Sequence, residues 1–421
     1  MLERLRFHLS RLRERLWVRP LAMAILSIGL VFLAEVADGT DLKHWVPRIR
    51  EASVEKLLEI LSASMLVIAT FAVASMVSAY ASAAQTATPR AFVLVVADDV
   101  SQSALSRFIG AFIFSVIALI ALENGYYERA GIFVLFVVTL GFFLLVVATF
   151  VRWVDRIARL GRMSNTLAKV EAAAGDALER RRCAPALGGV PLSEAPGAGR
   201  AVHARAIGYL QRVDVAALQA FAVEHGARIV AGAIPGAFID TTRPLAWVVA
   251  EAGAPGADLD LAAVAEAFEI GASRSYDDDP RFGLIVLSEI ASRALSPAVN
   301  DPGTAIDVLG RLLRLLARTV EPLPDGEAPD MRCERVAVPR IVVTDMFDDA
   351  FNAIARDGAG TVEVMLRLQK ALAALALLGD PSMREAAVRH GRRALARAER
   401  ALDLPEDLAR VRVAARFAAG P

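Results

Sequence analysis

The chain has 421 residues, 55% of them hydrophobic, and its 47 basic and 47 acidic residues give no net charge. This length allows two or three domains, and so apolar a composition is unusual for a soluble protein. Zero net charge gives no support to the concentrated basic surface that nucleic-acid binding requires, so we expect no nucleic-acid partner.

Four apolar runs in residues 1–154 predict a transmembrane domain. The expected helices cover about residues 20–36, 57–80, 104–122 and 130–151. About 20 residues of helix cross the hydrocarbon core of a bilayer, and about 17 are tolerated. The first run also resembles a signal peptide, with its basic leader and its small-residue exit AEVADG. The length of the leader and the three later runs favour an uncleaved anchor.

Arginines outside the apolar runs predict the orientation. Six arginines precede the first run, and Arg152, Arg156, Arg159 and Arg162 follow the fourth. Basic flanks remain on the cytoplasmic side, so both termini are expected there. Only four of the 47 basic residues are lysine, a bias typical of GC-rich bacterial genes. The predicted location is therefore the bacterial inner membrane, with the lipid bilayer as a partner.

Small residues form one side of the second span. At helical spacing this side contains Ala72 and Ala79 together with Ser64, Ser75, Ser78 and Ser82. One interpretation is close helix packing, within a subunit or between copies of a homo-oligomer. The other is a pore lined by the four serine hydroxyls. The spans contain no carboxylate or histidine deep in the membrane, which argues against proton pumps and many ion-coupled transporters.

The remainder of the chain predicts a cytoplasmic α+β domain. Residues 155–199 are expected to form an amphipathic basic helix and a Gly/Pro/Ala-rich linker. Short alternating segments and a Pro235-Gly236 turn predict a small β-barrel-like unit over residues 200–257. Residues 258–421 are expected to be mainly helical, with an apolar strand after residue 334.

The segment RALSPAVNDPGTA, residues 293–305, breaks one helix and starts another. Asp279, Asp301 and Asp380 each precede a proline, the pattern of an aspartate cap followed by proline at the first helical position. Asn300 suits the left-handed conformation of a tight corner. The alternative is a ligand pocket at this corner, and its candidate residues are Arg274, Asp277, Ser296, Asn300 and Asp301.

Recognisable motifs for chemistry are missing from the sequence. It contains no glycine-rich phosphate loop and no nucleophile elbow, and we nominate no catalytic residue. Two distant cysteines and five scattered histidines lack the spacing of a metal site, and the acidic run 277–279 lacks that of an EF-hand. We therefore expect no metal and no cofactor, and a role other than an enzyme is favoured.

Several segments together resemble a known family. SAYASAAQTATPRAFVLVVADD, GYLQRVD, PGAFIDTTRPLAWV and RSYDDDPRFGLIVLSEIASRALSPAVNDPGTAIDVL occur in this order. Together with the four spans they resemble bacterial predicted membrane proteins grouped as domain of unknown function 2254. The chain departs from the family pattern in the linker and in PGAFIDTTRPLA, where PGDFV and a glycine before PLA are expected. The resemblance implies an inner-membrane protein and implies no catalytic residues.

The leading hypothesis from the sequence is a passive, channel-like membrane protein regulated by its cytoplasmic domain. The serine-rich second span and the lack of charge deep in the membrane favour it. One alternative is a membrane-anchored sensor or scaffold that binds a small ligand or a partner near Asn300. A second is an enzyme that acts on a lipid or envelope precursor.

Overall fold

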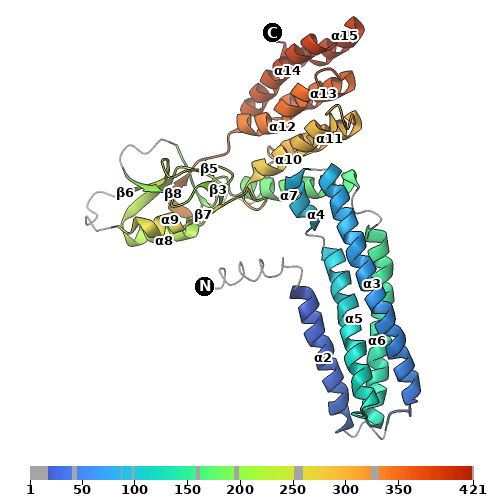
Figure 1. Ribbon diagram of the computed structural model, residues 1–421. Helices are drawn as coiled ribbons and strands as arrows, with labels where there is room; N and C mark the ends of the chain where they lie inside the picture. The colour runs from blue at the N-terminus through green and yellow to red at the C-terminus, as the bar shows by residue number, and fades with distance from the viewer. Residues whose placement is uncertain are drawn as a thin grey trace. The chain divides into compact units, whose positions relative to one another are not determined.

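A computed structural model describes the protein over residues 18–39, 45–86, 88–96, 99–157, 162–193, 199–250, 259–323 and 331–419 (Figure 1). The chain divides into two compact units, Met1–Thr166 and Leu167–Pro421. We call the first the membrane unit and the second the C-terminal unit.

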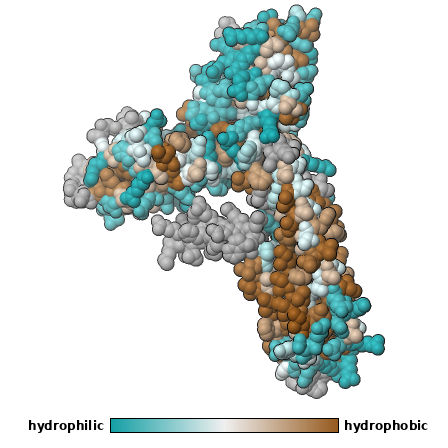
Figure 2. Space-filling model, viewed as in Figure 1, coloured by the Kyte–Doolittle hydropathy of each residue, from teal (hydrophilic) through white to brown (hydrophobic). Residues whose placement is uncertain are grey.

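Four helices of the membrane unit are long and apolar enough to cross a membrane, in agreement with the four apolar runs of the sequence. They are α2 (Val18–Asp38), α3 (Glu51–Thr86), α5 (Asp99–Glu123) and α6 (Arg129–Ile157). A short helix, α4 (Pro89–Val96), lies between α3 and α5 in the chain. The outer surface of the four long helices is strongly hydrophobic (Figure 2). Such a surface is what lipid tails would cover.

The interior of the four helices is filled by large side chains. Helix α5 packs against α2, α3 and α6. Phe108, Phe114 and Trp153 are fully buried there, and Phe114 stacks on Phe142 with 4.5 Å between the ring centroids. The interior of one copy is therefore a packed core.

Close approach of α2 and α5 depends on a small residue. A Cβ atom at Gly110 would lie 3.0 Å from the Cβ of Met23. The Ser27 hydroxyl, fully buried, donates to the carbonyl oxygens of Met23 at 2.7 Å and of Gly110 at 2.9 Å. Small residues and hydroxyls at helix contacts are typical of membrane bundles.

One end of the bundle is held by Asp38. Its carboxylate accepts hydrogen bonds from the backbone amides of Glu128 at 2.8 Å and Gly131 at 2.7 Å, where α6 begins. A side chain at Gly131 would collide with this carboxylate. Nearby, the Tyr127 hydroxyl donates to the Val31 carbonyl at 3.2 Å. Burial, together with the charges of Glu35 and Asp38, raises the pKa of Tyr127 to about 12.

The β part of the C-terminal unit consists of two open sheets. The larger has the strand order β1-β8-β4-β6-β2, and the smaller has the order β5-β3-β7. The strands are β1 (Gly189–Pro191), β2 (Arg200–His203), β3 (Gly208–Val213), β4 (Ala227–Ala231), β5 (Phe238–Ile239), β6 (Pro244–Ala250), β7 (Phe268–Gly271) and β8 (Cys333–Val338). Strand β8 runs parallel to both β1 and β4, and the other pairs are antiparallel.

The predicted barrel-like unit is wrong, because the described strands close no barrel. Residues 200–257 do not supply all the strands of either sheet, since β1 and β8 complete the larger and β7 the smaller. Two short helices accompany the sheets, α8 (Val215–Glu224) and α9 (Leu261–Glu266), and α8 packs on β4 and β8. Their common core includes Leu210, Leu218, Ile229, Leu245 and Phe268.

The helical part of the C-terminal unit is a stack of helix pairs (Figure 1). The paired helices are α10 (Pro280–Ala294), α11 (Pro302–Arg318), α12 (Val343–Asp357), α13 (Val362–Leu378), α14 (Pro381–Ala401) and α15 (Pro405–Ala414). A further helix, α7 (Met163–Cys183), belongs to this unit from Leu167 onward. Helix α10 packs on α12, and α12 on α14; α11 packs on α13, and α13 on α15. This layering of successive helix pairs is similar to that of helical solenoids.

The three Asp-Pro caps predicted from the sequence are confirmed. Asp279 accepts from the amides of Arg281 and Phe282, both at 3.2 Å. Asp301 accepts from Thr304 at 3.0 Å, and Asp380 from Met383 at 2.8 Å. Each following proline occupies the start of its helix. These caps set where α10, α11 and α14 begin.

A buried histidine lies between α12 and α14. His390 is 3% exposed, and its ring centroid lies 5.8 Å from that of Phe347 and 6.2 Å from that of Phe351. Its Nε2 lies 3.1 Å from a carboxylate oxygen of Asp348. Burial lowers the pKa of His390 to about 4, with Arg389 and Arg393 acting in the same direction and Asp348 opposing them. The ring is therefore neutral at pH 7.

Acid should destabilise the C-terminal unit through His390. The pKa is near 6.5 in the unfolded chain and about 4 in the fold, so unfolding takes up a proton between these values. The stabilisation is present above pH 6.5 and is lost as the pH falls toward 4, at up to about 1.4 kcal/mol per pH unit. We expect the difference in unfolding free energy between native protein and His390→Gln to shrink over this range. His203→Gln, at an exposed position of β2, is the matched control; a constant difference for His390→Gln would contradict the prediction.

Candidate functional site

A buried ion pair stands at the start of α10. Asp279 is 1% exposed, and its two carboxylate oxygens lie 2.6 Å from Nε and 3.0 Å from Nη2 of Arg274. The guanidinium of Arg274 also lies over the Phe282 ring, 5.5 Å from its centroid. Gly236, with a φ of +96°, brings the Pro235-Gly236 turn so close that a Cβ there would lie 2.5 Å from Asp279. The turn between β4 and β5 therefore meets the start of α10 at this carboxylate, and this contact joins the sheets to the helical stack.

A second arginine of α10 binds the neighbouring helix. The guanidinium of Arg281 lies 2.7 Å from the Asp345 carboxylate and 2.6 Å from the Asp349 carboxylate, both on α12. Burial raises the pKa of Asp349, and the charge of Arg281 opposes this shift. Arg281 and Asp349 are partly shielded from water, so this contact fixes α10 against α12.

Three consecutive arginines lie in the last turn of α7, and they differ in their partners. Arg180 donates to the carbonyl oxygen of Asp277. Arg182 pairs with Glu179 at 2.5 Å and donates to carbonyl oxygens of residues 321 and 322. Arg181 is 8% exposed, and none of its three guanidinium nitrogens has a hydrogen-bond partner within the described parts of the chain. Arg181 is not among the predicted site residues, because the sequence predicts only a basic amphipathic helix here.

The corner between α10 and α11 is a compact, exposed turn. The Ser296 hydroxyl donates to the Arg293 carbonyl at 2.6 Å, and the Asp301 amide donates to the Ala294 carbonyl at 2.8 Å. The Asp301 carboxylate also accepts from the Thr304 hydroxyl at 2.5 Å, and its hydrogen bonds from Thr304 lower its pKa. Asn300 has a φ of +48°, the left-handed conformation expected for it. These contacts explain the motif as a corner.

The structure does not bring the five predicted ligand residues together. Arg274 and Asp277 lie before α10, whereas Ser296, Asn300 and Asp301 follow its other end. The 15 residues of α10 separate the two groups by about 22 Å, at 1.5 Å per residue. Each group therefore has to be considered as a separate site.

Substitutions at Asn300 should show whether the corner depends on its backbone conformation. Asn300→Gly keeps the left-handed conformation accessible and should change the unfolding free energy by less than about 0.5 kcal/mol. Asn300→Val places a β-branched residue there and should cost about 1–2 kcal/mol. Ala298→Val, at an exposed position of the same corner, is the control. Denaturant unfolding of the full chain in detergent measures all three, and the prediction fails if Asn300→Val costs no more than the control substitution.

A groove on the membrane unit contains three of the four predicted pore residues. Ser75, Ser78 and Ser82 line it with Ala74, Ala79 and Ile157, and its volume is about 470 Å³. Ser64 is exposed but lies outside the groove. At 3.6 residues per turn, Phe71 falls on the same side of α3 between Ser64 and Ser75. Its ring contacts that of Trp153, with 6.0 Å between the centroids, so the serine side is interrupted by an aromatic residue.

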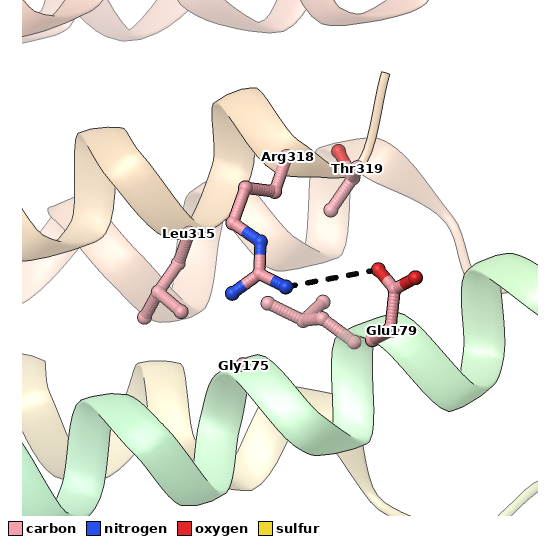
Figure 3. A pocket seen from close by; sticks show the side chains of 6 residues that line it. Gly175, Glu179, Leu315, Arg318 and Thr319 are labelled. Carbon is pink, nitrogen blue, oxygen red and sulfur yellow. Dashed lines mark ion pairs between the residues drawn. The ribbon is translucent and has the colours of Figure 1, made fainter. Parts of the chain in front are cut away.

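A small crevice lies between α7 and α11 (Figure 3). Gly175, Leu178, Glu179, Leu315, Arg318 and Thr319 line it, and it is too narrow to hold a water molecule. Arg318 and Glu179 face each other across it at 3.8 Å. Among the described residues, no group of three or more His, Cys, Asp or Glu side chains could hold a metal ion.

Comparison with known proteins identifies the family. Residues 13–374 match the model of the predicted membrane protein family DUF2254. The chain belongs to this family. It is 38% identical over 108 residues to an uncharacterized protein of Mycobacterium tuberculosis strain CDC 1551, and 37% identical over the same length to uncharacterized proteins of Mycobacterium bovis and of M. tuberculosis strain H37Rv.

Each of these matches covers 25% of this chain and 20% of the relative. This chain therefore matches only about a fifth of the length of its curated relatives. No solved structure matches the chain. The assignment to a membrane protein family agrees with the four apolar helices.

Proposed function

We propose that this protein is a homo-oligomer of the bacterial inner membrane that provides a passive path for small solutes between its copies. The observation that carries the proposal is the serine-lined groove on α3, an otherwise apolar helix of 36 residues. Three hydroxyls and two alanines on one side of a spanning helix favour contact with another protein surface over contact with lipid.

Packing within one copy supports a path between copies. The fully buried Phe108, Phe114 and Trp153 fill the centre of the four helices, which favours a path elsewhere. The groove, in contrast, is open on the outside of the bundle. Copies that meet along α3 would enclose it, and serine hydroxyls could then replace part of a solute's hydration shell.

The polar groups of the spans favour a passive mechanism. In the described part of α5, Arg107 donates to the Thr149 hydroxyl at 3.1 Å near the first turns of the helix. The acidic residues Glu35 and Glu59 are exposed and lie toward the ends of their helices. A proton relay needs titratable groups at mid-membrane depth, and the described residues of the four helices offer no such series. The distribution of arginines favours a cytoplasmic C-terminal unit.

Two tryptophan substitutions on α3 test the path. Ser78→Trp should fill the groove and reduce ion flux into liposomes at least about tenfold, the effect of closing a hydroxyl-lined path. Val77→Trp should leave the flux near the native value, because Val77 lies at the same depth but on another side of α3, where it is 60% exposed. The measurement is salt-driven flux from reconstituted full chain against empty vesicles. Equal flux in both variants, with insertion confirmed, would exclude the assigned path.

A membrane-anchored scaffold is the second candidate, and the stacked helix pairs α10 to α15 favour it. Stacks of this kind present extended surfaces to protein partners. In that case the reconstituted full chain would show no flux above empty vesicles. Chemical cross-linking in cells would then join α14 or α15 to a second protein, whereas a path alone predicts cross-links between copies along α3.

A further inference from the structure

Arg181 is a buried cation without a hydrogen-bond partner among the described residues, whereas its neighbours in α7 are paired. It lies in the last turn of α7 and is more than nine-tenths buried. Burial lowers its pKa to about 10, so the guanidinium is still charged at neutral pH. The acidic groups that act on it are Asp278 and Asp279. A charged group in this environment is unfavourable unless its hydrogen bonds are satisfied.

The carboxylate of Asp279 is already occupied. Arg274 binds both of its oxygens, and the amides of Arg281 and Phe282 donate to the same group. Asp279 can therefore attract Arg181 at a distance, but its hydrogen-bonding capacity serves α10 and Arg274. This explains why the guanidinium has no bond to it.

Asp278 does not neutralise Arg181 either. Burial raises the pKa of this carboxyl, which favours its uncharged form, while Arg180, Arg181 and Arg212 act against the shift. The other charged groups that act on Asp278 are three arginines and one aspartate: Arg180, Arg181, Arg212 and Asp277.

We propose that Arg181 binds a small oxyanion, a phosphate or a carboxylate group, at the junction of α7 with the 277–279 segment. A guanidinium presents parallel N–H donors that match two oxygens of such a group. The bound anion would satisfy the donors of Arg181 and offset its buried positive charge. It would also fix the end of α7, the helix that follows the last membrane span in the chain. This proposal does not depend on the path proposed above.

Thermal unfolding of the full chain in detergent provides the test. The probes are sodium phosphate and sodium acetate, each compared with sodium chloride at the same ionic strength. We expect the midpoint to rise in a saturable way with at least one oxyanion. Arg181→Met should weaken the apparent affinity by about tenfold to a hundredfold, the loss of one charge-assisted contact of about 1.5–3 kcal/mol. Arg181→Lys keeps the charge but loses the paired donors. Its apparent affinity should lie between that of the native chain and that of Arg181→Met.

Arg182→Met is the matched control, because the adjacent Arg182 already pairs with Glu179. It should respond to the oxyanion as the native chain does. A response to phosphate alone identifies a phosphate site, and a response to acetate alone identifies a carboxylate site. The proposal is overturned if neither oxyanion raises the native midpoint more than chloride, or if Arg181→Met responds as fully as the native chain. Equilibrium dialysis with radioactive phosphate supplies a second readout that does not depend on unfolding.

Discussion

The C-terminal unit depends on one buried carboxylate. Asp279 caps α10, binds Arg274 with both oxygens, and lies against the Pro235-Gly236 turn. Removing it would leave a guanidinium and two helix amides without partners, a larger loss than any single hydrogen bond contributes. This arrangement requires a glycine in the turn, because a side chain at Gly236 would occupy the space of the Asp279 carboxylate.

In the membrane unit the governing constraint is that lipid offers no hydrogen bonds. Buried hydroxyls bond to nearby carbonyls, as Ser27, Ser115 and Thr139 do, and Asp38 receives the free amides where α6 begins. Bulky aromatic residues then fill the centre around α5. The serine groove stands apart from this pattern, since it places several small polar residues on an outer surface. That contrast is what motivates an interface between copies.

Patterns in the sequence predict the features that depend only on residues close together in the chain. The four spans follow from runs of apolar residues, and the caps at Asp279, Asp301 and Asp380 follow from Asp-Pro pairs. The open sheets were mispredicted, because β8 comes long after β6 in the chain and no local signal gives its partners. The buried state of Arg181 likewise depends on how α7 packs.

The candidate ligand residues were predicted as one pocket, and the structure places them in two groups. The apolar stretch before Ser296 predicts a helix, and this helix separates Arg274 and Asp277 from Asn300. The length of that helix was a sufficient signal, because a straight element of 15 residues keeps its ends apart. The position of three hydroxyls in one groove could be anticipated from helical spacing, but the aromatic break at Phe71 could be interpreted only with Trp153 in place.

The topology of the larger sheet also determines which strands can pair while the chain is still being synthesised on the ribosome. Strand β8 lies between β1 and β4, yet α10 and α11 precede it in the chain. Until residue 338 has emerged from the exit tunnel, β1 has no neighbour among the described strands and β4 pairs only with β6. The helix pair α10 and α11 can form from local contacts in the meantime, because helices need no distant partner. A nascent chain paused before β8 would therefore carry a folded helix pair beside an exposed strand edge, the state in which a chaperone would be most needed.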